Sequence, residues 1–395
     1  MAIVVQKYGG SSVADLDKIG AVADRIVETA TQGHQVVVTV SAMGDTTDEL
    51  LDLAKRISPT PSRRELDMLL TAGERISMAL LSMAIHERGR DAVSLTGSQS
   101  GIITNDQHSG ARIVEIRPFR IQDELARGRI VIVAGYQGVS YKREVTTLGR
   151  GGTDTTAVAL AAALGAQWCE ICSDVDGIYT ADPRVVEDAQ RIPELSFEET
   201  QEMAEAGARV LNAQAVEFAK ERGIAIYARA TVAGNPGAPD LKREGTVVRK
   251  FPPNAPGRVR AVVSEELLWL VRSAAPAETL ERFDTAGIGG KQLFAGDGEL
   301  TLVIPASTVP ADFPYGFDVT ANDSLSAASL IGAGINDSHA NLRRGLQTLN
   351  GAGISVELTA TSSFRITYLL KRTELKKAVQ SLHREFIEET GPAVP

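Results

Sequence analysis

The sequence predicts an α/β protein with a mainly parallel sheet sandwiched by helices, followed by a smaller α+β region. Over residues 1–235, short apolar runs typical of buried strands alternate with segments of helical spacing. Strands that alternate with helices imply a parallel sheet covered on both faces. After residue 257 the order changes to strand, helix, strand, strand, and that order occurs twice, which indicates an internal duplication.

The elements of the first region follow from runs and spacing of apolar residues. Strands are expected where apolar or β-branched residues run together, at 3–6, 35–40, 92–95, 129–134 and 166–173. Helices are expected where apolar residues recur every three or four positions, at 16–30, 49–57, 64–87 and 155–164. Ligands bind at the carboxyl ends of parallel strands. Here those ends carry polar and Gly-rich segments, at 7–12, 41–48, 135–138 and 173–179.

A linker is expected where the pattern changes, because the segment FPPNAPG at 251–257 is rich in Pro, Gly and Asn. We therefore expect a first domain over residues 1–250, a linker over 251–258 and a tandem domain over 259–395. The tandem domain divides into units of about 259–322 and 323–395. Its strands are expected at 260–272, 291–295, 299–304, 326–331, 354–358 and 364–370, and its helices at 278–286, 341–351 and 374–388.

The composition excludes several classes of protein. The 395 residues carry a formal net charge of −9 and no run of basic residues, so nucleic acid is not an expected partner. No stretch of about 20 apolar residues predicts a membrane span. The pattern at the N-terminus predicts a strand rather than a signal peptide. Two cysteines give no disulfide framework, which fits a reducing cytosol, so we expect a cytoplasmic protein.

Two Gly-rich segments are candidate anion-binding loops. The first, KYGGSS, places Lys7 beside Gly9 and Gly10, where backbone N–H groups and a helix N-terminus can approach a phosphate. Its alternative is a tight turn with a solvated lysine. The second, LGRGGTDTT at 148–156, adds Arg150 for carboxylate recognition and the carboxylate of Asp154. Its alternative is ordinary helix capping by its Thr and Asp side chains.

Two further segments are candidates for nucleotide and amine binding. In SDVDGIYTADPR at 173–184, the carboxylates of Asp174 and Asp182 suit Mg²⁺, directly or through water, and Tyr179 can pack on a base. An ordinary acidic loop is the alternative. SAMGDTTD at 41–48 and TAGER at 71–75 offer hydroxyls and acidic groups for an amino-acid amine, with helix capping as the alternative.

Several familiar signals are absent from the sequence. There is no P-loop motif and no complete G-x-G-x-x-G. The five histidines show no spacing typical of metal ligands, so we expect no metal centre built from protein side chains alone. Cys169 and Cys172 form a C-x-x-C pair inside an expected buried strand, which favours core packing over redox chemistry.

Together these motifs resemble the aspartate kinases of the amino-acid kinase family. The resemblance runs from Lys7 to about Thr246 and includes, in order, KYGGSS, VSAMGDTTDEL, LLTAGERIS, TGSQSG, IVAGYQG, TTLGRGGTDTTAVALAAAL and SDVDGIYTADPR. The tail resembles a pair of ACT domains, which bind amino acids such as lysine and threonine in this family. The resemblance implies an amino-acid kinase fold over residues 1–250, then a tandem ACT-like regulatory domain with a truncated first unit.

The resemblance also implies an activity and a role for each matching residue. The activity is transfer of the γ-phosphoryl group of ATP, with Mg²⁺, to the β-carboxylate of L-aspartate, giving 4-phospho-L-aspartate. The implied catalytic residues are Lys7, Arg150 and Asp154. The implied substrate-binding residues are Thr47, Glu74, Arg150, Gly151, Gly152 and Thr153. The implied nucleotide-binding residues are Lys7, Tyr8, Gly9, Gly10, Ser41, Ser173, Asp174, Tyr179, Asp182, Arg184 and Arg209, the last standing where the family usually has Lys.

The tail departs from the family pattern in its turns. The usual D-x-P-G turn of the first ACT unit is replaced by 273–278, SAAPAE, and the S-H-P-G turn of the second by 337–340, DSHA. We therefore expect feedback inhibition by lysine and threonine to be weak or absent, and the tail to hold subunits together in a dimer or tetramer. Two alternatives remain open at this point: a kinase of the same fold for another amino acid, and a non-catalytic amino-acid sensor.

Overall fold

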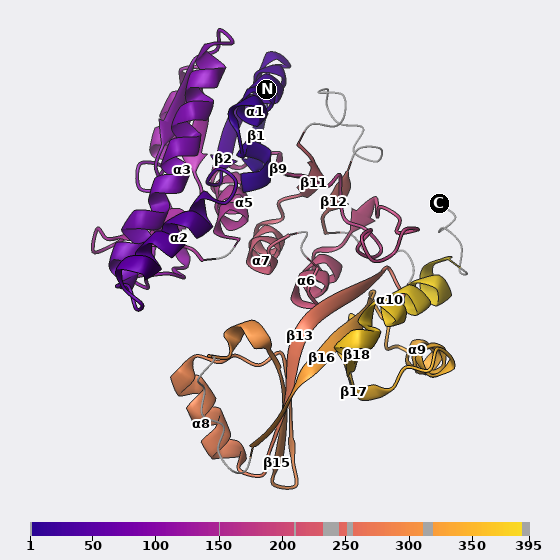
Figure 1. Cartoon of the computed structure of the whole chain (residues 1–395). Helices are drawn as coiled ribbons and strands as arrows, with labels where there is room; N and C mark the ends of the chain where they lie inside the picture. The colour runs from indigo at the N-terminus through magenta and orange to yellow at the C-terminus, as the bar shows by residue number, and fades with distance from the viewer. Residues whose placement is uncertain are drawn as a thin grey trace. The chain divides into compact units, whose positions relative to one another are not determined.

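The computed structural model describes residues 2–149, 151–208, 211–231, 245–250, 256–310 and 319–388. The chain forms two compact units, each built from more than one stretch of sequence (Figure 1). The first consists of Met1–Ile178, Arg191–Gln201 and Val210–Pro252, and the second of Tyr179–Gln190, Glu202–Arg209 and Pro253–Pro395.

The first unit contains an eight-stranded sheet with the order β10-β12-β11-β9-β1-β2-β6-β3. Neighbouring strands are parallel except β11 and β12, which confirms the predicted mainly parallel sheet. The strands are β1 Ile3–Tyr8, β2 Gln35–Val40, β3 Ala92–Leu95, β6 Ile130–Ala134, β9 Trp168–Ser173, β10 Glu194–Leu195, β11 Ile226–Ala230 and β12 Thr246–Val248. The sequence predicted the first five of these; the other three are short or follow no clear apolar run.

Helices α1 (Leu16–Thr31) and α3 (Arg63–His86) cover one face of this sheet. Their apolar residues, among them Ile26 and Leu81, form one core with Tyr8 of β1 and Val38 of β2. Helix α5 (Gly152–Leu164) packs against β1, β2 and β9, beside α7 (Ala213–Arg222). Side chains alternate along a strand. Because Tyr8 faces α1 and α3, Lys7 faces the opposite side, where α5 lies.

Four further helices belong to the described part of the first region. They are η1 (Gly10–Val13), α2 (Thr46–Ile57), α4 (Phe119–Ala126) and α6 (Phe197–Glu205). By length and composition alone, α3 is long and apolar enough to cross a membrane. Half of its apolar stretch is buried inside the structure, as in the core helix of a folded domain.

A second, four-stranded sheet in the first unit was not predicted. Its order is β5-β4-β7-β8, with β4 Ile102–Thr104, β5 Ile113–Ile116, β7 Gln137–Ser140 and β8 Val145–Thr147. The Gly-rich segment 135–138, which was expected at the end of a strand, follows β6 and includes the start of β7 at Gln137. Strands of three or four residues are too short to show a period of two. β8 leads directly into the Gly-rich segment 148–156.

The second unit contains a six-stranded sheet with the order β14-β15-β13-β16-β18-β17. Its elements are β13 Ala261–Ser273, α8 Pro276–Ala286, β14 Gln292–Gly296, β15 Glu299–Pro305, η2 Ala306–Thr308, β16 Val319–Ile331, α9 Ala340–Gly351, β17 Val356–Thr361, β18 Arg365–Lys371, η3 Arg372–Glu374, α10 Leu375–His383 and η4 Arg384–Glu388. The pairing β13–β15–β14 repeats as β16–β18–β17, and the long strands β13 and β16 join the halves (Figure 1). This repetition matches the predicted duplication.

Each half of the second sheet has its own helical cover. Phe283 of α8 packs with Val271, Leu300 and Ile304, whereas α9 and α10 pack over Leu330 and neighbouring residues of the other half. The predicted strands and helices of the tail all appear, with shifted ends. The expected linker 251–258 lies mostly outside the described residues.

The two cysteines lie in the core of the first unit, on β9, as predicted. Cys169 and Cys172 are both free and fully buried. Burial raises the pKa of the Cys172 thiol to about 11 and that of Cys169 well above its usual value. Such thiols are poor nucleophiles, which favours a packing role.

Candidate active site

An ion pair joins β1 to α5 at the carboxyl edge of the first sheet. Nζ of Lys7 lies 2.7 Å from Oδ1 of Asp154, and the two side chains are 12% and 13% exposed. The alternation along β1 accounts for the pair, because it directs Lys7 toward α5. A solvated lysine, the alternative considered from the sequence, is therefore excluded. Enough of both groups remains exposed for a ligand to reach them.

The loop after β1 brings backbone close to backbone. The amide of Gly44 donates to the carbonyl of Gly10 (3.1 Å), and a Cβ at Gly10 would lie 3.0 Å from the carbonyl oxygen of Ala42. At Gly9 a Cβ would lie 3.3 Å from Nζ of Lys7. Glycine therefore keeps the lysine end and the loop backbone open to an anion.

Hydroxyl groups tie this loop to two other strand ends. Oγ of Ser12 lies 2.6 Å from Oγ1 of Thr231, which also donates to the carbonyl of Ser173 (2.9 Å). Ser41 donates its amide to the carbonyl of Tyr8 (3.1 Å). The predicted role of Tyr8 in nucleotide binding applies only to its backbone. Its side chain is fully buried in the core, so only its backbone reaches the loop.

The first turn of α5 begins with glycines. Gly151 has a φ of 76°, a left-handed conformation that favours glycine, and no side chain caps the helix. The capping alternative therefore does not hold. A Cβ at Gly135 would lie 2.5 Å from Cγ2 of Thr153, so Gly135 lets the first turn of α5 pack against the strand end. The N–H groups of Gly152 and Thr153 lie in this first turn, where helix N-termini bind anions.

Glu74 of α3 is the second carboxylate at this edge. It is 3% exposed, and Oε1 accepts the amide of Ala42, just after β2, at 3.2 Å. Oε2 is buried and has no hydrogen-bond partner among the described residues. Burial raises the pKa of Glu74 to about 7, the amide of Ala42 opposing that shift. Thr47, in the first turn of α2, is half-buried, and Asp45 does not cap that helix.

The predicted nucleotide-binding residues fall in different parts of the structure. Ser173 ends β9 and its hydroxyl donates to the carbonyl of Val175 (3.2 Å), while Asp174 is exposed. Tyr179, Asp182 and Arg184 belong to the second unit, where Arg184 pairs with Asp182 at 2.7 Å.

Two predicted arginines fall outside the part of the chain that the structure describes. These are Arg150, expected to bind the substrate carboxylate, and Arg209, expected to contact ATP.

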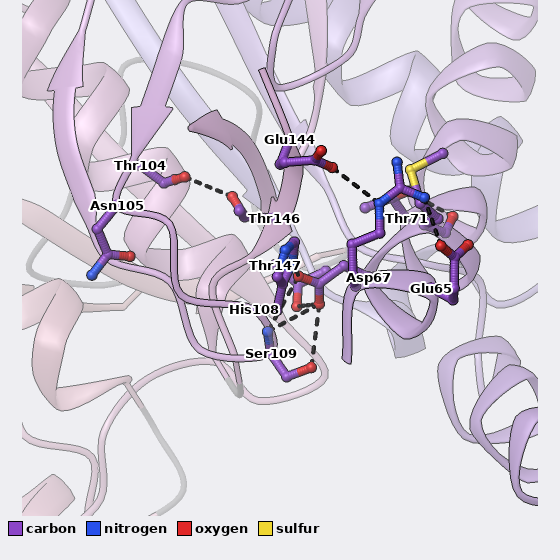
Figure 2. Close-up of polar contacts among 12 residues, drawn as sticks. Glu65, Asp67, Thr71, Thr104, Asn105, His108, Ser109, Glu144, Thr146 and Thr147 are labelled. Carbon is purple, nitrogen blue, oxygen red and sulfur yellow. Dashed lines mark hydrogen bonds and ion pairs between the residues drawn. The ribbon is translucent and has the colours of Figure 1, made fainter. Parts of the chain in front are cut away.

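A buried polar network below the second Gly-rich segment was not predicted. Asp67 of α3 is fully buried and accepts from Oγ1 of Thr147 (2.6 Å) and the amide of Ser109 (3.1 Å), and it lies 2.7 Å from Nδ1 of His108 (Figure 2). In the sequence, Asp67 lies between Leu66 and Met68, two residues after another acidic residue, Glu65. No local pattern therefore marked it as the buried member of a network.

A protein-built metal centre is not evident in the described residues, which contain no group of three or more His, Cys, Asp or Glu side chains able to hold a metal ion. A divalent ion at this edge would therefore take most of its ligands from a nucleotide and from water, the donor set that Mg²⁺ usually has.

Comparison with known proteins agrees with this arrangement. Residues 2–228 match the amino acid kinase family, and residues 329–386 match an ACT domain. The chain is 44% identical to an aspartokinase of Mycolicibacterium smegmatis over 98% of this chain and 96% of the relative.

Two solved structures of aspartokinase III from E. coli are similar over nearly the whole chain. The complex with aspartate and ADP has a TM-score of 0.82 at 25% identity and covers 97% of this chain and 99% of that one. The complex with lysine and aspartate has a TM-score of 0.76 at 24% identity and covers 98% and 99%.

The raised pKa of Glu74 leads to a prediction about stability. The unfolded chain ionises Glu74 near 4.5, whereas the folded protein does so near 7. The contribution of Glu74 to stability is therefore present below pH 4.5 and lost as the pH rises to 7, by about 3 kcal/mol. In Glu74→Gln this loss is absent, so the free energy of unfolding of the variant minus that of the wild type increases from pH 5 to pH 7.

Urea denaturation of the ligand-free protein at several pH values measures this difference. Glu49→Gln, a change at an exposed residue of α2, serves as the matched control and should show no such trend. A difference for Glu74→Gln that stays constant between pH 5 and pH 7 contradicts the prediction.

Proposed function

We propose that this chain, which belongs to the amino acid kinase family and within it to the aspartokinases, transfers the γ-phosphoryl group of ATP to the β-carboxylate of L-aspartate. One observation carries the proposal for the site. The unpartnered, buried Oε2 of Glu74 lies on the first unit at the same sheet edge as the Lys7 ammonium. One group suits the amine of an amino acid, and the other suits a phosphoryl group.

The chemistry requires little covalent help from the protein. An oxygen of the substrate β-carboxylate forms a bond to the γ-phosphorus, and the bond from phosphorus to the β,γ-bridging oxygen breaks, releasing ADP. The nucleophile is already an anion, so no proton has to be removed. The work of the protein is positioning and neutralisation of charge.

Lys7 carries the neutralisation in this proposal. Its ammonium lies at the end of β1 beside Gly9, where backbone can approach the phosphates. Asp154 holds the ammonium in place from α5. Because both side chains are largely shielded from water, their attraction is less screened than that of a surface pair. The preorganised charge then stabilises the transferring phosphoryl group.

Substrate recognition is assigned to the groups around Glu74 and the first turn of α5. The ionised Glu74 binds the α-amine, with Thr47 nearby. The N–H groups of Gly151 and Thr153 bind a carboxylate at the positive end of the helix, beside Gly152, whose own amide donates to the carbonyl of Gly149 (3.0 Å). Arg150 adds a bidentate contact.

Nucleotide binding is assigned to the backbone of Tyr8, Gly9 and Gly10 and to two strand ends, with Ser41 after β2 and Ser173 and Asp174 after β9. The exposed carboxylate of Asp174 suits Mg²⁺, directly or through water. When bound, Mg²⁺ neutralises charge on the phosphates. The resemblance also implies nucleotide roles for Tyr179, Asp182 and Arg184, which lie in the second unit, and for Arg209, which lies outside the described residues; the site proposed here is confined to the first unit.

The two alternative functions considered from the sequence are not favoured. A kinase for another amino acid and a non-catalytic sensor both find less support than an aspartokinase, because the relative at 44% identity is an aspartokinase matched over nearly its full length. The Lys7–Asp154 pair also argues against a sensor, which would not need it.

Removal of the Lys7 charge is expected to abolish most of the activity. In Lys7→Met, kcat for aspartate falls by about 10²- to 10³-fold, because a preorganised charge at the transferring group is lost. The measurement is aspartyl hydroxamate formation from ATP, Mg²⁺, L-aspartate and hydroxylamine. Lys18→Met, at a half-exposed lysine of α1, is the control and should leave kcat unchanged. A folded Lys7→Met variant with wild-type kcat would refute the assignment.

Feedback control is proposed to be weak or absent in this protein. Effector pockets of ACT domains use backbone groups of the turn before the first helix. In the turn before α8, the amide of Ala275 already donates to Oγ of Ser273 (3.0 Å), which is also hydrogen-bonded to Thr279 (2.7 Å). The turn therefore uses one of its own backbone donors, that of Ala275, and offers an effector one fewer.

Titration with lysine and threonine, singly and together, tests this proposal in the same assay. We expect the activity to change by less than about fivefold, the lower end of allosteric coupling. Inhibition at sub-millimolar effector would show that the altered turns still bind an amino acid.

The tail is also proposed to assemble the protein into a homo-oligomer. β14 is an edge strand of the second sheet, and Leu293 and Phe294 on it are 52% and 43% exposed. An exposed apolar edge invites pairing with another chain. Sedimentation equilibrium should give a dimer or tetramer for the wild type and a smaller species for Leu293→Lys. A wild-type monomer would exclude this role. The two free, buried cysteines fit the cytoplasm as the proposed location.

A further inference from the structure

We propose that Asp67 is a positioning residue. It holds the Gly-rich loop at the start of α5 in place and so determines how tightly that loop binds a substrate carboxylate. The inference rests on the proposed function, because it concerns the same site. It assigns a role to a buried network that does not itself contact the expected substrate but holds Thr147, just before the second Gly-rich segment.

Both carboxylate oxygens of Asp67 have polar partners. Its Oδ1 accepts the hydroxyl of Thr147 at 2.6 Å and the amide of Ser109 at 3.1 Å. Its Oδ2 lies 2.7 Å from Nδ1 of His108. A carboxylate only accepts hydrogen bonds, so the proton between them belongs to His108. A fully buried carboxylate is costly unless such donors satisfy it. The network therefore connects helix α3 with His108, Ser109 and Thr147 (Figure 2).

The donors come from two chain segments that lie against each other. The carbonyl of Thr147 accepts the amides of Gly110 (3.1 Å) and Ala111 (2.8 Å). A Cβ at Gly149 would lie 3.5 Å from Cα of Gly110, so the two segments remain in contact past Thr147. Both the side chain and the backbone of Thr147 are thus held, two residues before Gly149.

Ser109 shows that this arrangement is imposed by the network. Its φ is 59°, in the left-handed region that non-glycine residues rarely adopt. Both its amide and its hydroxyl face Asp67, the hydroxyl at 3.4 Å. Strained backbone persists only where the surroundings determine it, and it gathers at functional sites. Here the surroundings are the carboxylate of Asp67.

Helix α3 links this anchor to the proposed amine site. Asp67 and Glu74 are seven residues apart, so they lie on the same face, separated by about 10 Å along the axis. One rigid helix thus holds Glu74, which binds the amine, and Asp67, which holds the loop that leads to Gly151 and Gly152. The spacing between the two contacts with the substrate depends on that helix.

Thr147→Val tests the inference. Valine keeps the shape of threonine and removes the hydroxyl that joins the loop to Asp67. We expect the KM for aspartate to rise by about tenfold or more, in line with the loss of a hydrogen bond to a charged group, while the KM for ATP changes by less than about twofold. Thr147→Ser, which restores the hydroxyl, should return the KM for aspartate toward the wild-type value.

Thr146→Val is the matched control. Thr146 is equally buried in β8, and its hydroxyl lies 2.6 Å from that of Thr104, with no contact to Asp67 (Figure 2). A selective rise in the KM for aspartate in Thr147→Val alone supports the inference. An unchanged KM, or an equal change in Thr146→Val, overturns it and leaves a merely structural role. If Thr147→Val does not fold, Asp67→Asn takes its place in the same comparison.

The wild-type enzyme separates this inference from the proposed function. A wild type without activity toward aspartate overturns the proposed function, and this inference with it. An active wild type with an unaltered Thr147→Val variant overturns the inference alone.

Discussion

The ion pair between Lys7 and Asp154 is the constraint on which the rest of the site depends. It requires that β1 direct Lys7 away from the core formed by α1 and α3, and that α5 begin at the carboxyl edge of the sheet. Those two conditions place the two Gly-rich segments next to each other. Tyr8, the next residue on β1, lies on the other face and is a fully buried core residue. One strand therefore supplies a core residue and the lysine that we propose to be catalytic.

The two carboxylates at this edge have different surroundings. Asp154 lies against an ammonium, whereas burial raises the pKa of Glu74 to about 7 and leaves one of its oxygens without a partner. Asp154 is thereby committed to holding Lys7. Oε1 of Glu74 already accepts the amide of Ala42, whereas Oε2 is left for a cationic group, and we propose that this oxygen selects the substrate amine. Such divergent environments commonly separate the roles of acidic groups in active sites.

The sequence predicted the elements and motifs that depend on local pattern. Long apolar runs such as 35–40 and the helical spacing of 64–87 became β2 and α3 with small shifts at their ends. The Asp67 network was missed because its partners lie 41, 42 and 80 residues away along the chain, and no local pattern reports such contacts. The division into units was equally hidden, since Tyr179–Gln190 belongs with the tail despite its place in the first region.

The duplicated tail explains how a regulatory turn can change while the fold remains. β13 and β16 are the central pair of the six-stranded sheet, and each half repeats the same order of pairing around them. Loss of the first half would leave β16 as a long exposed edge, a surface prone to aggregation. A change in the turn before α8 does not expose such an edge. The hydroxyl of Ser273 is hydrogen-bonded to Thr279 and to the amide of Ala275 within the turn itself. Altered effector binding and an intact sheet are therefore compatible in the same half.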